Sequence, residues 1–198
     1  MRITAARRAA LCAAAAFSVI VTAGCGPAPW ADEQTAPPSS PPPTASAPVP
    51  NDLSGGSTQR ELSAGAVSAE IEYWSTLSMD RWDAGAVKPI SFSLVTTITP
   101  DDGQKVYLQK ASMLVVPGNA DATFPPLEVQ ADVATVAPGY LVSDPYSYSQ
   151  TFNVGPVDPD ATFVTVQFTY DFLAQTTPTS KEYAKQTASD SLTIAIAR

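Results

Sequence analysis

The chain has 198 residues, 44% of them hydrophobic, which is enough for one ordinary globular domain with additional segments. The first 24 residues hold three arginines and no acid, and the rest holds the other 8 basic side chains against all 19 acidic ones, a net charge of −11. Phosphate backbones and anionic lipid headgroups repel such a domain. We therefore expect no nucleic-acid partner, and no membrane attachment through a basic patch.

The first 24 residues have the layout of an export signal. Met1 to Arg8 is short and basic, and 9–24 is an uncharged, alanine-rich run of 16 residues. A permanent membrane span needs about 20 apolar residues, so this run is short for an anchor and suits a secretory signal. Residues 1–24 are therefore predicted to be a signal peptide, and Cys12 is predicted to be discarded with it.

The residues that follow this run carry a more specific signal. Val21-Thr22-Ala23-Gly24-Cys25 resembles the lipobox of bacterial lipoprotein precursors, in which a small residue and then Ala or Gly come directly before Cys. The resemblance implies cleavage between Gly24 and Cys25, and a diacylglyceryl group on the Cys25 sulfur. Two acyl chains give stable anchoring where one gives only reversible binding. The alternative is an ordinary signal peptide in which Cys25 is incidental, and Thr22 stands where leucine is commonest.

Residues 25–66 are predicted to form a flexible tether. Nine of the 19 prolines fall between Pro27 and Pro50, with serine and threonine around them. This composition favours polyproline II and coil, and about 40 residues at about 3.1 Å each reach about 120 Å when fully extended. We expect a spacer between a lipid anchor and a folded head, with hydroxyl groups that are either glycosylated or unmodified.

The head is predicted to span residues 67–198, where apolar and polar residues alternate with the period-two pattern of strands. Turn sequences such as Pro100-Asp101-Asp102-Gly103 separate these stretches, and short helical turns are expected at 78–84 and 181–185. The predicted strands are 67–74, 90–98, 106–116, 127–136, 146–154, 164–172 and 192–196. About seven short strands predict an all-β domain, an antiparallel β-sandwich of the immunoglobulin-like kind without a disulfide.

The overall layout has a counterpart among known proteins. A signal peptide, a lipid-bearing cysteine, a proline-rich tether and an all-β head in an alanine-rich sequence resemble the cell-envelope lipoproteins of actinobacteria. The resemblance implies an exported protein on the outer face of the cell membrane, held there by the lipid on Cys25. It implies nothing about what the head binds, because no motif in the head carries it.

Missing residue types exclude several chemistries. The chain has no histidine, and its two cysteines, Cys12 and Cys25, precede the head. A Ser-His-Asp or Cys-His nucleophile and a cysteine-based zinc site therefore cannot form. No Ser-x-x-Lys pair and no glycine-rich phosphate loop occur in the head either. We expect no cofactor and no enzymatic activity. A hydrolase using two carboxylates remains an alternative, with candidate acids at Glu70, Glu72, Glu128, Asp132 and Asp171.

Two groups of residues are candidates for binding. Asp101, Asp102, Asp158 and Asp160 lie in turn sequences and are weak candidates for calcium, although aspartate is also an ordinary turn residue, the interpretation that we favour. Trp74, Trp82 and Tyr140 are candidate contact residues, and Trp74 stands first because its side chain points opposite to Ile71 and Tyr73 on a predicted strand. Tyr146 and Tyr148 share a predicted face with Phe152, so we expect them in the core.

The function that we expect is a non-enzymatic binding or scaffolding module of the cell envelope. Its partner is expected to be an envelope protein or a glycan, in addition to the membrane that the lipid on Cys25 reaches. The alternatives are a carboxylate-dependent hydrolase acting on wall glycan, and a carrier of small apolar molecules with a dry internal cavity.

Overall fold

A computed structural model describes residues 48–198, which belong to one compact unit that begins at Ser46. The predicted signal peptide, cleavage site and lipid-bearing Cys25, with the tether up to residue 47, lie outside the described residues. Within residues 48–198 no helix is both long and apolar enough to cross a membrane. The unit contains its own hydrophobic core, so a fragment that starts at Ser46 keeps every described contact.

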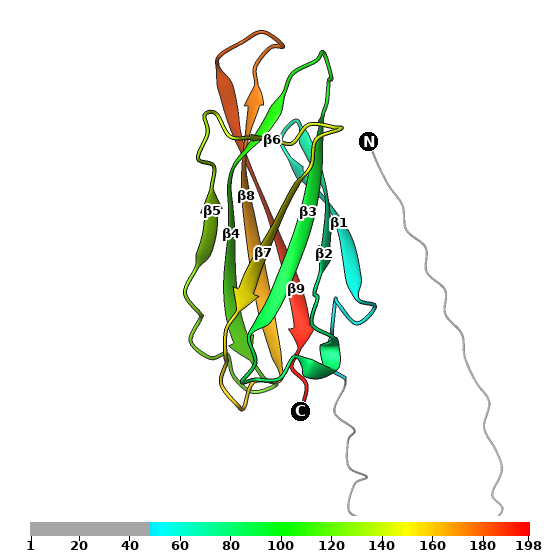
Figure 1. The fold of residues 1–198 in the computed structure, drawn as a ribbon, viewed down its shortest axis with the longest axis vertical. Coiled ribbons are helices and arrows are strands. Elements are labelled where there is room, and N and C mark those ends of the chain that lie inside the picture. The colour runs from blue at the N-terminus through cyan, green and yellow to red at the C-terminus, as the bar shows by residue number, and fades with distance from the viewer. Residues whose placement is uncertain (1–47) are drawn as a thin grey trace, which may run out of the picture. The chain divides into compact units, whose positions relative to one another are not determined.

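Nine strands and one short 3-10 helix make up the domain (Figure 1). The strands are β1 (Ser57–Ala64), β2 (Val67–Trp74), β3 (Lys88–Ile98), β4 (Val106–Gly118), β5 (Gln130–Val133), β6 (Tyr140–Leu141), β7 (Tyr148–Val154), β8 (Phe163–Gln175) and β9 (Tyr183–Ala195), and the helix is η1 (Met79–Arg81). The helix lies inside the predicted 78–84 turn. The turn predicted at 181–185 is wrong, because β9 begins at Tyr183 and pairs with β8 along its whole length.

The strands form two antiparallel sheets that pack face to face, so the predicted β-sandwich is confirmed. One sheet has the order β1-β2-β3-β7, and the other has the order β5-β4-β8-β9 with β6 beside β4. The chain changes sheet between β3 and β4 and returns for β7, so that β3 pairs with β7 and β4 with β8. This crossed connection is that of immunoglobulin-like sandwiches. The prediction of about seven strands omitted β1 and the two-residue β6.

The domain begins earlier than the predicted boundary at residue 67. β1 pairs with β2 over all eight of its residues, although its sequence was assigned to the tether. Its alternate residues Thr58, Arg60, Leu62 and Ala64 are the less exposed ones, and only Leu62 among them is large and apolar. The hydrophobic pattern is therefore too weak to mark the strand. Further upstream, Leu53 is fully buried in the core.

Aromatic side chains fill the space between the two sheets. Tyr73 of β2 and Phe92 of β3 pack against Phe168 and Tyr170 of β8, with ring centroids 5.0 to 5.7 Å apart for the closest pairs. The Tyr170 hydroxyl donates a hydrogen bond of 3.1 Å to the Tyr73 hydroxyl and so links the two sheets inside the core. Burial raises the pKa of both tyrosines well above the ordinary value, and the negative charge of Asp190 adds to the effect.

Lys88 secures one end of the sandwich. The residue is fully buried, and its ammonium donates to the carbonyl oxygens of Asp83 (3.0 Å), Ala86 (2.6 Å) and Gly155 (3.1 Å). These carbonyls belong to the β2–β3 and β7–β8 connections, which Lys88 therefore holds together. Burial lowers the pKa of the ammonium. We call this end, where β3 begins, the proximal end, and the opposite end, where β3 stops, the distal end.

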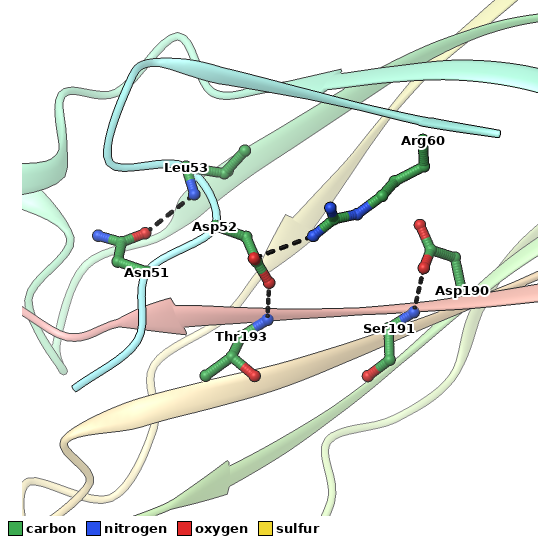
Figure 2. Close-up of polar contacts among 7 residues, drawn as sticks. All are labelled: Asn51, Asp52, Leu53, Arg60, Asp190, Ser191 and Thr193. Carbon is green, nitrogen blue, oxygen red and sulfur yellow. Dashed lines mark hydrogen bonds and ion pairs between the residues drawn. The ribbon is translucent and has the colours of Figure 1, made fainter.

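Two of the edge strands, β9 and β7, are partly covered by side chains rather than by further strands. On β9, Asp52 and Thr193 exchange two hydrogen bonds, from the Asp52 N–H to the Thr193 carbonyl (2.8 Å) and from the Thr193 N–H to Asp52 Oδ2 (2.7 Å). The Ser191 N–H donates to Oδ1 of Asp190 at 2.8 Å, as Figure 2 shows. Asp52 also forms a 3.0 Å ion pair with Arg60 of β1. The start of the domain is thereby fixed to the edge of the opposite sheet.

Side chains also hydrogen-bond to the backbone groups at the edge of β7. The Asn153 N–H donates to Gln130 Oε1 at 3.1 Å, and the Gln130 amide donates back to the Asn153 carbonyl at 2.5 Å. The Thr151 N–H donates to the side chain of its neighbour Gln150 at 2.8 Å. Gln130 belongs to β5, so this contact joins the two sheets at the side opposite to β1 and β9.

Replacing Lys88 tests the proximal link. Lys88→Met keeps the length of the side chain but leaves three carbonyls without their donor, so we expect the free energy of unfolding to fall by about 3 kcal/mol. The measurement is urea unfolding of residues 46–198 followed by tryptophan fluorescence. Lys181→Met, at an exposed position, is the control and should change stability by less than about 0.5 kcal/mol. Equal effects of the two substitutions would contradict the assignment.

The buried tyrosines predict a steep loss of stability in alkali. Their pKa values are raised in the folded state, so their contribution is complete below the unfolded pKa of about 10 and declines as the pH rises above it. With Tyr73 and Tyr170 both held protonated, we expect a slope of up to about 3 kcal/mol per pH unit. Tyr170→Phe should make this slope shallower in urea unfolding measured between pH 9 and about pH 11. An unchanged slope would contradict the prediction.

Candidate functional site

The distal end is built from the tight β1–β2 turn at 65–66 and from three longer connections. The longer connections are 99–105 between β3 and β4, 142–147 between β6 and β7, and 176–182 between β8 and β9. Val142 lies between the sheets, because its N–H donates to the Val106 carbonyl (3.0 Å) and its carbonyl accepts the Thr96 N–H (2.8 Å). Ser143 Oγ accepts the Val106 N–H at 2.6 Å. The 142–147 connection is therefore held to both sheets.

A pocket of about 380 Å³ lies between the first two of these connections. Its apolar part comes from Ile98 and Leu141, and Tyr146 lies at it with 58% of its surface exposed. Asp101, Asp144 and Lys105 bring charged groups into the lining. A concave site with an apolar base, an exposed aromatic ring and a few polar groups is the usual form of a binding site. The volume suits a monosaccharide-sized ligand or one long side chain of a partner.

The carboxylates of this pocket carry no ion pair. Residues 48–198 form two ion pairs, Arg60–Asp52 and Lys185–Asp171, and neither includes a pocket residue. Asp101 Oδ1 accepts the Gly103 N–H at 2.9 Å, which closes the turn that the sequence predicts. Gly103 has a φ of +93°, the left-handed conformation that this turn requires and that glycine adopts readily. The pocket can therefore offer acidic oxygens to a ligand.

Tyr140, a predicted contact residue, lies beside the pocket but is half-buried. Its ring stacks on that of Tyr148, with centroids 5.2 Å apart and an angle of 15° between the planes. The Tyr148 hydroxyl donates to a carboxylate oxygen of Asp132 on β5. Burial, and next this hydrogen bond, raise the pKa of Tyr148 above its ordinary value. The stacked pair forms one side wall of the domain near the distal end and leaves Tyr146 as the accessible tyrosine.

The structure contradicts one of the two candidate tryptophans and leaves the other as a candidate. Trp82, a candidate contact residue, is 0% exposed, so that prediction is wrong. Its indole N–H donates to Ser75 Oγ at 3.1 Å, and its carbonyl accepts the Ala197 N–H, so it packs inside the proximal end. Trp74 stands opposite Ser57 and Ser91 on the outer face and is half-buried. The structure does not bring Trp74 and Tyr140 together, because they lie toward opposite ends of the sandwich.

The four candidate calcium residues are not brought together. Asp101 and Asp102 belong to the distal end, whereas Asp158 and Asp160 lie in the β7–β8 connection at the proximal end. Asp158 Oδ1 accepts the Asp160 N–H at 2.9 Å, a turn contact like that of Asp101. Across residues 48–198 no group of three or more acidic side chains has the spacing of a metal site.

Sequence reasoning did not identify Tyr146 as a pocket residue. Tyr146 was assigned to the inward face with Tyr148, but β7 begins only at Tyr148, and Pro145 precedes Tyr146 in the connection. The one available signal was the run Asp144-Pro145-Tyr146, a turn sequence next to a large aromatic residue, which loops use for binding more often than strand interiors do.

The chain matches no known protein family model, and no curated protein matches its sequence. The function therefore has to be argued from the chain itself.

Proposed function

We propose that the chain is an exported lipoprotein, anchored to the outer face of the cell membrane through lipid on Cys25, whose sandwich domain is a non-enzymatic module that binds an envelope protein or glycan at its distal end. The anchor rests on the lipobox-like sequence and on the net negative charge, which leaves no electrostatic route to a membrane. The binding role rests on the distal pocket.

The position of the pocket is the observation that supports the proposal most. Asp52 contacts Thr193 near the end of β9, so the described chain begins at the proximal end. The pocket includes Thr96, Thr97 and Ile98, at the far end of β3. The 11 residues of β3 span about 35 Å at about 3.3 Å each. A tether joined before Asp52 therefore attaches at the end opposite to the pocket, and the pocket is directed away from the attachment point.

A carboxylate-dependent hydrolase is the second candidate, because Asp101 and Asp144 line one pocket. A glycosidase needs two carboxyl groups facing its substrate. The two functions separate on purified residues 46–198 with wall glycan as substrate: a hydrolase releases reducing ends, and Asp144→Asn abolishes the release, whereas a binding module retains the glycan unchanged. A carrier of small apolar molecules is less favoured, because aromatic side chains of the two sheets pack against one another in the interior.

Crosslinking in cells tests the distal site. A photoreactive phenylalanine at Tyr146 (58% exposed) should capture a partner protein or glycan, and the same residue at Val87 should not. Val87 is the matched control because it is 59% exposed and precedes Lys88 at the proximal end. Equal crosslinking at both positions, or none at Tyr146, would argue against a distal binding site.

Replacing the predicted lipid-bearing residue tests the anchor. Cys25→Ser should abolish labelling by an alkyne-tagged fatty acid and release the protein from the membrane fraction, because no second attachment is expected. Cys12→Ser is the control and should leave both labelling and membrane location unchanged. Continued labelling of the Cys25→Ser protein would overturn the proposal that this cysteine carries the lipid.

A further inference from the structure

The free edge of β9 is covered along only part of its length. In an antiparallel pair, alternate residues direct both their N–H and their carbonyl away from the neighbouring strand. Thr193 is such a residue, since both groups bond to Asp52. In the same row, Ser191 donates its N–H to Asp190, and Ala197 donates to the Trp82 carbonyl. Figure 2 shows the first two of these covered positions. The proximal part of the edge is therefore closed to further pairing.

The distal part of the same edge has no such hydrogen-bonded cover, and the side chain of Gln186 within it lies against Gly65 of the β1–β2 turn. The pairing of β8 with β9 has no register shift from Tyr183 to Ala195, so Ser189, Thr187 and Lys185 continue the outward row that includes Thr193. These three N–H groups point away from β8, and among residues 48–198 no other group accepts a hydrogen bond from them. All three side chains are exposed, and β9 contains no proline. Natural edge strands are usually protected by charge, proline, a bulge or a cover, and this stretch has only one lysine.

We propose that this open stretch of β9, from Lys185 to Ser189, is a strand-addition site for an extended, basic segment of a partner protein. Backbone hydrogen bonds supply the affinity in this mode of recognition. The outer-face neighbours Thr187 and Ser189 are small, so the site places few demands on the partner's side chains. The proposal does not rest on the distal pocket, because no residue of the stretch lines it.

Charge identifies the occupant. Residues 48–198 hold 8 basic and 17 acidic side chains, a net charge of −9, so a second copy of the chain is repelled. Within the stretch the Lys185 ammonium is already paired with Asp171 at 3.1 Å. The exposed Glu182 lies beyond its distal end, whereas Asp190 at the other end accepts the Ser191 N–H and has its second carboxylate oxygen buried. A basic strand with small or β-branched residues between its ends complements the net negative charge of the domain and Glu182.

The experiment uses residues 46–198 and the peptide acetyl-Lys-Val-Thr-Val-Thr-Val-Lys-amide. In the free protein, the amides of Lys185, Thr187 and Ser189 should exchange with solvent much faster than that of Thr193. The peptide should slow them and shift their NMR signals. A peptide of the same sequence with alternate amides N-methylated should bind at least about tenfold more weakly, because it lacks the donors. A peptide with both lysines replaced by glutamate should show no binding.

Two protein variants locate the site. Ser189→Pro removes an outward N–H without removing a bond to β8, so the fold should persist while peptide affinity falls about tenfold or more. Ser191→Pro is the matched control, since its N–H is already covered by Asp190, and affinity should change less than about threefold. If neither variant folds, the N-methylated peptide on the unaltered protein still decides the question.

Four results would overturn the proposal. The first is slow exchange of all three amides in the free protein, and the second is an absence of peptide binding. The third is equal binding of the methylated and unmethylated peptides. The fourth is a concentration-dependent dimer, seen by sedimentation and lost in Ser189→Pro, because it would show that a second copy occupies the edge. None of these outcomes bears on crosslinking at Tyr146.

Discussion

Unpaired backbone groups at the edges of two open sheets are the constraint on which this domain depends. The sandwich is not closed into a barrel, so β7 and β9 each present a row of N–H and carbonyl groups that must be bonded or solvated. Both strands meet the requirement in the same way. On β7, the side chain of Gln150 accepts the N–H of the next residue, and Gln130 accepts the N–H two positions further along. On β9, Asp190 and Asp52 do the same.

These caps also position the proposed binding surfaces. Because Asp52 covers β9 near its end, the chain enters the domain at the proximal end, and the loops of the distal end remain unobstructed. Lys88 ties the proximal connections together, while Val142 holds a distal connection between the sheets. The pocket beside Tyr146 therefore rests on a supported framework. The stretch of β9 between the last cap and the distal loops is left with unpaired backbone groups.

The sequence was informative where the structure is local and periodic. The period-two patterns of β2, β3 and β8 and the turn at Gly103 could be predicted because each depends on near neighbours. The strand β1 could not, since its less exposed positions include the polar residues Thr58 and Arg60, and Arg60 pairs with Asp52 outside the strand. Nor could the caps, because Asp52 and Thr193 are 141 residues apart. Tyr146 was placed wrongly because β7 begins only at Tyr148, and Trp82 because its burial depends on contacts with Ser75 and Ala197 that the sequence pattern does not show.

The attachment of Asp52 and Leu53 has a mechanical consequence. A pull applied to the chain before Asn51 reaches the two Asp52–Thr193 hydrogen bonds and the buried Leu53 side chain before it reaches the β1–β2 ladder. Tension on the N-terminal side therefore acts first on the contacts of Asp52 and Leu53 at the proximal end. The loops of the distal end keep their geometry while these contacts hold.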